Sequence, residues 1–279
     1  MKHLETQWKS RDGLTILGQG WEPDAQPPKA IVCLVHGLGE HSARYAHVAE
    51  AFVREGYALF AADTRGHGRS EGPRGHIPSI EAVMQDIDGL LEQARTSYPE
   101  LPLFLYGHSL GGILVLHYGL KRKPAVQGAI VTSPALHTAL EQQPAKVMAA
   151  KVLGTFLPGV SLPSGLDPTQ ISRDASVVQA YTSDPLVHDK VTLGFGKIMI
   201  GVNQWTLEHA REFPLPLLLL HGQSDAIAFA TSSTEFAASM GDKCSLSVYE
   251  GAFHELHNEP EKKEVFRTMT DWLDTQLGK

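Results

Sequence analysis

Six short runs of apolar residues, each bounded by turn-forming residues, recur along the 279-residue chain. Continuously apolar runs of this length are typical of strands that are buried on both faces of a parallel sheet. The runs cover residues 30–37, 57–63, 101–109, 126–133, 215–222 and 244–251.

Helical patterns lie between these runs, with apolar residues spaced three and four apart. The clearest extend from Ile80 to Ala94 and from Val265 to Leu273. A stretch around Asp12 and Gly13 adds an expected edge hairpin. The sequence thus predicts an α/β fold: a mostly parallel, doubly wound sheet of about eight strands with helices on both faces.

Residues 136–205 interrupt the alternation of strands and helices. They contain prolines at positions 144, 158, 163, 168 and 185 and only short amphipathic pieces, with no good sheet strand. We expect a core formed by residues 1–135 and 206–279, with 136–205 as a cap or lid insertion. The insertion follows the run that ends at Ser133, so it should leave the carboxyl edge of the sheet, where such folds bind ligands.

Composition excludes several classes of protein. Apolar residues make up 42% and charged residues 20% of the chain, as in ordinary globular proteins. The net charge of -7 gives no electrostatic reason to bind nucleic acid. No signal-like or membrane-spanning run is present, so a cytoplasmic location is expected.

Metal sites and disulfides are not expected either. The 14 histidines are scattered rather than grouped at metal-ligand spacing, and neither a metal nor another cofactor is predicted. Cys33 and Cys244 lie in apolar runs, where a thiol behaves as a small buried hydrophobe.

The segment Gly107-His108-Ser109-Leu110-Gly111 directly follows an apolar run and directly precedes a helical pattern. This is the setting of a nucleophile elbow, in which a serine occupies a strained turn between strand and helix. Because a serine hydroxyl is a weak nucleophile, it needs a base within hydrogen-bond reach and a third group that orients the base.

The partners of Ser109 are sought in the order serine, acid, histidine, which is the chain order in α/β-hydrolases. Asp225 and His254 each come just after a predicted strand, at the same edge of the sheet. Competing candidates remain: Glu141, Asp242 and Glu250 for the acid, and His257 for the base.

An oxyanion hole needs two backbone N–H donors. One is expected from Leu110, directly after the nucleophile, and the other from Leu38 in the segment His36-Gly37-Leu38-Gly39. The glycine-rich loop 63–70 lacks a phosphate-binding motif, so we interpret it as a supporting turn.

Five blocks of the sequence resemble the monoacylglycerol lipase and lysophospholipase branch of the α/β-hydrolases. They are HGLGEHSARY (36–45), DTRGHGRSEGPRGH (63–76), GHSLGG (107–112), YTSDPLVH (181–188) and FHELHNE (253–259). The match is looser at Thr64 and at residues 226–229.

The resemblance implies an α/β-hydrolase fold and a serine esterase that hydrolyses carboxylic monoesters, above all monoacylglycerols, through an acyl-enzyme. It also implies that Glu40, Arg44, His108 and His257 lie at the polar end of the substrate site. For Glu40 and Arg44, a structural ion pair four residues apart is an equal alternative.

The resemblance further implies that the insertion is a cap. Its apolar residues would line an acyl tunnel, touch a membrane surface transiently or simply pack in a core. The candidates are Val147, Met148, Val152, Leu153, Phe156 and Leu157.

Other hydrolases share the same motifs. A general carboxylesterase or lysophospholipase is the main rival, followed by a thioesterase. Dehalogenases and epoxide hydrolases place aspartate at the nucleophile, and a non-catalytic module on this fold generally lacks part of the triad. The sequence leaves the oligomeric state open.

Overall fold

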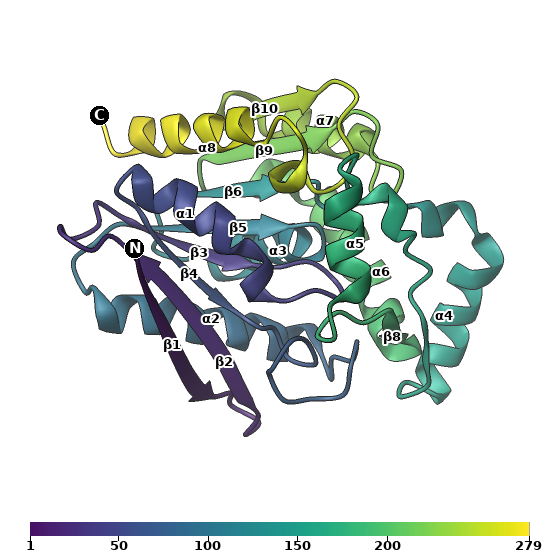
Figure 1. The fold of residues 1–279 in the computed structure, drawn as a ribbon. Helices are drawn as coiled ribbons and strands as arrows, with labels where there is room; N and C mark the ends of the chain where they lie inside the picture. Colours follow the sequence, from purple (N-terminus) through teal and green to yellow (C-terminus); the bar gives the residue numbers. More distant parts are fainter. Residues whose placement is uncertain (279) are drawn as a thin grey trace.

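The computed structural model describes residues 1–278 and has an eight-stranded sheet at its centre, with strand order β1-β2-β4-β3-β5-β6-β9-β10 (Figure 1). β1 and β2 form an antiparallel hairpin, and β2 also runs antiparallel to β4. From β4 to β10 all neighbouring strands are parallel. The strands are β1 (Lys2–Lys9), β2 (Thr15–Glu22), β3 (Ile31–Val35), β4 (Ala58–Ala62), β5 (Leu103–His108), β6 (Gly128–Thr132), β9 (Leu217–Gly222) and β10 (Cys244–Tyr249).

Helices cover both faces of the sheet. Buried residues of α1 and α8 pack on one face, and those of α2, α3, α6 and α7 pack on the other. The helices are α1 (Ala46–Arg54), α2 (Ile80–Ser97), α3 (Leu110–Arg122), α4 (Pro144–Phe156), α5 (Ala175–Ser183), α6 (Leu193–Glu208), α7 (Ala230–Met240) and α8 (Lys262–Gln276).

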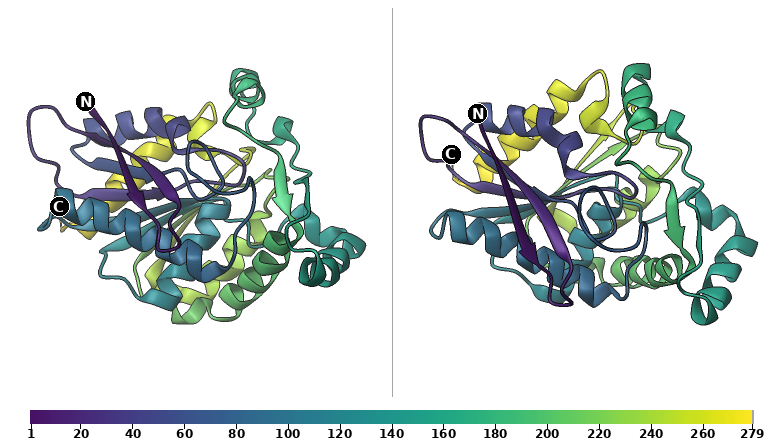
Figure 2. Two further views of the ribbon diagram at one scale, coloured as in Figure 1. Left: turned by 90° about the horizontal axis from the view of Figure 1, so that it is seen from below. Right: turned by 60° about the horizontal axis from the view of Figure 1, so that its bottom comes forward.

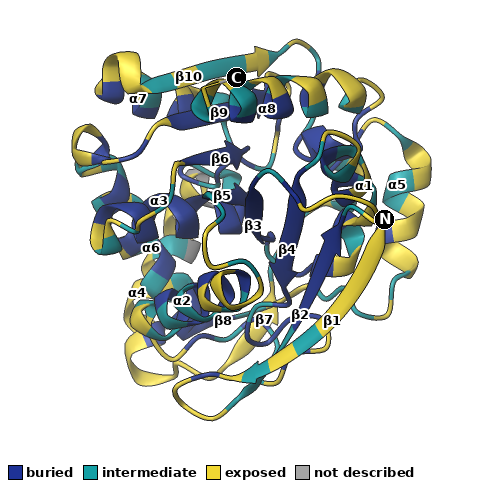
Figure 3. Ribbon diagram, turned by 90° about the vertical axis from the view of Figure 1, so that its left-hand side faces the viewer, coloured by how far each residue is buried: buried dark blue, intermediate teal, exposed yellow. Residues whose placement is uncertain are grey.

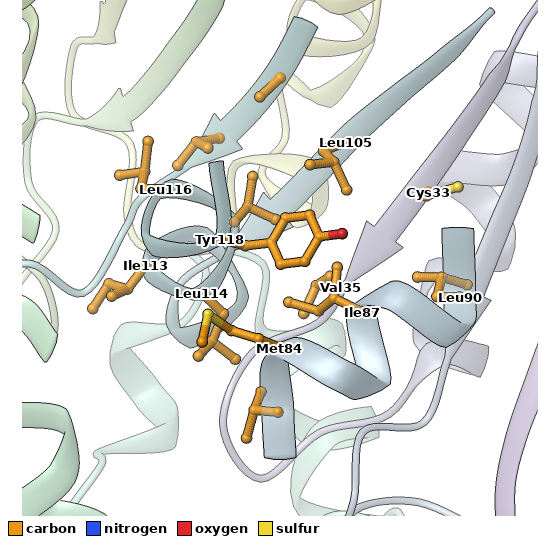
Figure 4. Packing of buried hydrophobic residues seen from close by; sticks show 14 of the residues in the cluster. Cys33, Val35, Met84, Ile87, Leu90, Leu105, Ile113, Leu114, Leu116 and Tyr118 are labelled. Carbon is orange, nitrogen blue, oxygen red and sulfur yellow. The ribbon is translucent and has the colours of Figure 1, made fainter. Parts of the chain in front are cut away.

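The strands are apolar throughout because both of their faces are covered. Successive side chains of a strand point to opposite faces, so Val32 and Leu34 of β3 join one core cluster, while Cys33 and Val35 join the other. Figure 3 shows β3 and β4 as buried and the edge strand β1 as largely exposed. In Figure 4, residues of β3 and β5 meet side chains of α2 and α3 in the larger cluster.

The segment after β6 leaves the sheet and returns only at β9. It contains α4, α5 and the short strands β7 (Ser161–Pro163) and β8 (Lys190–Thr192), which pair with each other and not with the main sheet. In Figures 1 and 2, these teal and green elements gather at one end of the sheet. α6 follows them, and its buried Phe195, Met199 and Val202 belong to the main core.

These features confirm the predicted fold class, including the edge hairpin, the mostly parallel sheet of eight strands and the helices on both faces. Cys33 and Cys244 are both free thiols. No helix within residues 1–278 is long and apolar enough to cross a membrane.

Candidate active site

Ser109 lies between β5 and α3, in a backbone conformation that L-residues rarely adopt. Its φ is 54° and its ψ is -115°. Gly107 and Gly111 allow this turn, because a β-carbon at Gly111 would lie 1.9 Å from the carbonyl oxygen of Val35. A β-carbon at Gly107 would lie 2.4 Å from the carbonyl oxygen of Gly111. The strained turn predicted for a nucleophile elbow is therefore present.

Ser109, His254 and Asp225 form a continuous chain of hydrogen bonds. The Oγ of Ser109 lies 2.8 Å from Nε2 of His254, and Nδ1 of His254 lies 2.6 Å from Oδ2 of Asp225. A carboxylate only accepts hydrogen bonds, so Nδ1 donates to Asp225 and Nε2 is free to accept from the serine hydroxyl. All three side chains are buried.

Electrostatics at this chain of residues favour a charged aspartate and a basic histidine. Burial alone would lower the pKa of His254, but the Asp225 carboxylate beside it raises that pKa above the ordinary 6.5. Burial alone would raise the pKa of Asp225, but His254 and a hydrogen bond from His221 hold it well below 3.8. Such a histidine can take a proton from a hydroxyl and keep it beside the carboxylate.

The other predicted candidates lie elsewhere. Glu141 is bonded to the half-exposed His137 and not to His254. His257 is fully buried and stacks on Tyr45 at 4.7 Å, and neither of its ring nitrogens has a hydrogen-bond partner among the described residues. Of the two histidines considered for the base, His254 is the one that reaches Ser109.

The loop after β3 brings a second backbone amide to the site. Leu38 lines the same small cavity as Ser109. Within residues 1–278, neither the N–H of Leu38 nor that of Leu110 is bonded to a protein acceptor. Glu40 secures this loop, because its Oε1 accepts hydrogen bonds from the Gly37 N–H at 2.7 Å and from the Tyr45 hydroxyl at 2.8 Å.

Arg44 joins the oxyanion loop to the histidine loop. It binds Glu40 at 2.6 Å and makes two parallel hydrogen bonds, each 2.8 Å, to Glu255. All three side chains are at most 10% exposed. The ion pair considered for Glu40 and Arg44 is thus present, extended by Glu255, whose role the sequence analysis did not foresee.

The cavity over Ser109 is small, about 10 Å³, near the lower limit for one water molecule. Glu40 and His108 line it, and burial lowers the pKa of His108 to about 3. Arg44 and His257 do not line it and instead lie one layer behind, against Glu40 and His108. The remaining lining residues are Gly37, Leu38, Leu166, Ile171, Tyr181, His254 and Glu255.

Two stretches of the segment above the sheet are bonded to the catalytic loops. The Ile171 carbonyl accepts from the Glu255 N–H, and the Ser172 hydroxyl donates to the Asn258 carbonyl. At the other stretch, the His188 N–H donates to the Gly39 carbonyl at 2.9 Å. Residues 171–172 and 188 therefore hold this segment onto the base loop and the oxyanion loop.

The loop 63–70 contacts the segments next to the oxyanion loop through hydrogen bonds to Ser42 and His36. The Asp63 carboxylate accepts hydrogen bonds from the Ser42 N–H and hydroxyl and from the Arg69 N–H. Arg65 is bonded to Asp86 through two nitrogens, and also to Asp12. These contacts agree with the interpretation of a supporting turn.

Sequence reasoning missed several residues of the site. Leu166 and Ile171 are lone apolar residues in an irregular segment and carry no recognisable pattern. His221 places a second imidazole on Asp225. The sequence shows it only as the polar end of an apolar run, and a polar side chain in a buried strand is the feature that could have indicated its role.

The fold and the hydrogen-bonded serine, histidine and aspartate define a serine hydrolase of the α/β-hydrolase class. The family model described as serine aminopeptidase, S33, matches residues 26–261. An abhydrolase domain-containing protein of Dictyostelium discoideum is 40% identical over 95% of this chain, which spans 28% of that longer protein.

Two further relatives match at nearly full length. The monoacylglycerol lipase of Mycolicibacterium smegmatis is 37% identical, covering 95% of each chain. The crystal structure of Paleococcus ferrophilus monoacylglycerol lipase superimposes with a TM-score of 0.85 at 33% identity, covering 99% of this chain and all of that one. The chain therefore belongs to the α/β-hydrolase family whose model matches residues 26–261. It is a serine hydrolase of the lipase and esterase class.

Proposed function

We propose that the protein hydrolyses carboxylic monoesters, above all monoacylglycerols, through an acyl-enzyme on Ser109. His254 takes the hydroxyl proton as Ser109 attacks the ester carbonyl, and then passes that proton to the leaving alcohol. A water molecule, activated by the same imidazole, releases the fatty acid. The observation that carries this proposal is the unbroken hydrogen-bond chain from Ser109 through His254 to Asp225.

The oxyanion of the tetrahedral intermediate would be bound by the backbone N–H groups of Leu38 and Leu110. Support comes from their lack of a protein acceptor within residues 1–278, which leaves both groups available to a ligand. Leu110 also begins α3, where the helix dipole favours negative charge.

The polar end of the cavity would hold the alcohol of the ester. Glu40 and His108 can contact it directly, whereas Arg44 and His257 support those two residues from behind. An aminopeptidase would need a free carboxylate for the substrate ammonium, but Glu40 and Glu255 are both bound to Arg44. The full-length relatives that are named as monoacylglycerol lipases support an ester substrate.

An active-site fluorophosphonate probe tests the chemistry. We expect labelling of the wild type, no labelling of Ser109→Ala, and strongly slowed labelling of folded His254→Ala. Absence of labelling in folded wild-type protein would contradict the proposal.

The substrate class is tested with a chain-length series of monoacylglycerols, lysophospholipids and p-nitrophenyl esters. We expect the highest kcat/KM for monoacylglycerols with medium or long chains. Faster turnover of lysophospholipids, or of short esters regardless of the alcohol, would favour the lysophospholipase or the general carboxylesterase.

We also propose that the part of residues 136–205 that precedes α6 forms a cap, one side of which touches lipid. Large apolar side chains are exposed on and just after α4, with Phe156 at 77%. The sequence of α4 contains no acidic residue and includes Lys151, which suits an anionic lipid surface. The exposed residues are Met148, Val152, Leu153, Phe156, Leu157, Val160 and Leu162.

Vesicle sedimentation tests this contact. Phe156→Ser combined with Leu157→Ser should weaken binding to phosphatidylcholine–phosphatidylglycerol vesicles and leave hydrolysis of a soluble ester unchanged. Val248→Ser is the matched control, because Val248 is also exposed, at 44%, but lies on β10. Equal binding of the double variant and the control would refute the lipid contact.

A further inference from the structure

Asp225 is in contact with two imidazoles, and only one of them belongs to the triad. The second is His221, the residue of β9 directly before the last one, Gly222. Its side chain is fully buried. Its Nε2 lies 3.2 Å from Oδ2 of Asp225, the same oxygen that His254 binds. That oxygen therefore lies between the two rings.

The partners of His221 fix its tautomer. Nε2 also lies 3.0 Å from the carbonyl oxygen of Ala228, and both of its partners are oxygens that only accept. Nε2 must therefore carry the proton and donate it. Nδ1 accepts from the hydroxyl of Ser233, on α7, at 2.7 Å.

The remaining oxygen of Asp225 is held by the backbone. Oδ1 accepts from the N–H groups of Ile227 and Ala228, at 2.8 and 2.9 Å. Without His221, His254 would be the only partner of Oδ2 among residues 1–278, and Oδ2 could move while Oδ1 stays on its two backbone bonds. Within the described part of the chain, His221 alone ties Oδ2 to the strand scaffold.

We propose that His221 is a positioning residue for the triad: supported by Ser233, it holds Oδ2 of Asp225 in line with Nδ1 of His254. This inference rests on the proposed function of Ser109, His254 and Asp225. With Oδ2 held in this position, the carboxylate also stabilises the protonated form of His254.

Two substitutions separate this role from simple packing. His221→Leu keeps a similar volume and removes both ring nitrogens. His221→Gln places an amide N–H₂ near the position of Nε2, with one hydrogen for Asp225 and one for the Ala228 carbonyl. Each variant is assayed for kcat and KM on a soluble p-nitrophenyl ester across the pH range, with folding checked by thermal unfolding.

We expect His221→Leu to lower kcat by about 10- to 100-fold, the range known for residues that hydrogen-bond and orient the ligands of metal sites, with KM nearly unchanged. We expect His221→Gln to recover most of the loss. In His221→Leu the acid limb of the kcat/KM–pH profile should move to lower pH, because a displaced carboxylate stabilises the imidazolium of His254 less, and the NMR resonance of the His254 Nδ1 proton should shift. Other charged or titratable groups near His254 stay in place: His108, His257, Glu40, Glu255 and Arg44.

His117→Leu is the matched control. His117 is also buried and its Nδ1 also meets a hydroxyl, that of Thr206 at 3.0 Å, but it lies on α3 away from Asp225. Its substitution should change stability without moving the acid limb or the Nδ1 resonance. If His221→Leu does not fold, Ser233→Ala provides the test: loss of the hydroxyl that holds Nδ1 of His221 should lower kcat and move the acid limb in the same direction.

Three outcomes would overturn the inference. His221→Leu could match the wild type in kcat, His221→Gln could be no better than His221→Leu, or the acid limb could stay fixed in the folded variants. If the wild type is active and His221→Leu is equally active, the role of His221 is overturned but the proposed function is not. Wild type that is neither labelled by fluorophosphonate nor active would overturn the proposed function, and the role of His221 with it.

Discussion

Arg44 binds the carboxylate of Glu255, the residue directly after His254, through two parallel hydrogen bonds of 2.8 Å. Because Arg44 also binds Glu40 on the oxyanion loop, one largely buried cation fixes two loops of the site against each other. Its charge also offsets two buried carboxylates.

Replacement of Arg44 by methionine should destabilise the fold strongly. The change leaves Glu40 and Glu255 buried without their cation, and removal of one partner of a buried ion pair typically costs about 3–5 kcal/mol. Urea unfolding measures the loss. Arg54→Met is the control: Arg54 pairs with Glu50 at the surface and is 73% exposed, so its unfolding midpoint should hardly change. Equal midpoints for the two variants would contradict a structural role of Arg44.

Replacement of Gly111 by alanine should displace the oxyanion hole. The added β-carbon would lie 1.9 Å from the Val35 carbonyl oxygen and 2.6 Å from that of His36, so α3 must move away from β3 and carry Leu110 with it. Loss of one oxyanion donor costs about 100- to 1,000-fold in rate, and kcat for a soluble ester should fall in that range.

The control for this variant is Gly201→Ala, inside α6, where a β-carbon meets no atom within 4 Å. Alanine there should leave kcat unchanged and raise stability by about 0.5–1 kcal/mol, because glycine is the poorer helix former. Full activity of Gly111→Ala would argue against the position assigned to the Leu110 N–H.

Substitution of the two neighbouring histidines should give opposite results. His254→Ala removes the base and should lower kcat by about 10⁶-fold, as in other serine triads. His257→Phe should keep kcat within a few fold, because a phenyl ring can retain the stacking on Tyr45 and neither nitrogen of His257 has a described partner. A folded His257→Phe as inactive as His254→Ala would refute the assignment of the base.

The pH dependence of kcat/KM should report His254. Its pKa is raised above 6.5, because the effect of Asp225 outweighs that of burial, so the protonated, inactive form persists to higher pH than for a free histidine. Activity should therefore fall on acidification through a pH above 6.5.

Asp225→Asn should move this acid limb to lower pH, because the imidazolium loses its counter-charge, and should lower kcat by about 10⁴-fold. A pH–rate series on a soluble ester measures both effects. An acid limb in the same place for wild type and Asp225→Asn would show that Asp225 does not control the base.

The sequence predicted those parts of the fold and the site that depend on residues close together in the chain. The apolar runs gave the strands because each strand is buried on both faces, and the strained setting of Ser109 follows from adjacent residues. Asp225 and His254 were found because each directly follows a strand, and the carboxyl ends of parallel strands share one edge.

The rest depends on contacts between distant segments. Nothing in the sequence near Glu255 shows that Arg44, more than two hundred residues earlier, will bind it. Likewise, Leu166 and Ile171 reach the cavity only because their irregular segment folds back over Ser109. The resemblance to known lipases placed Arg44 near the polar end of the substrate site, whereas the residues that line the cavity do not include it.

The bonds from Ile171 and Ser172 to the base loop, and from His188 to the oxyanion loop, constrain how the segment above the sheet can open. Lifting α5 would pull on the loops that carry the base and an oxyanion donor. Movement of α4 would break none of these bonds. Opening of this segment to admit a substrate would therefore keep the catalytic groups aligned only if residues 171–172 and 188 stay in place.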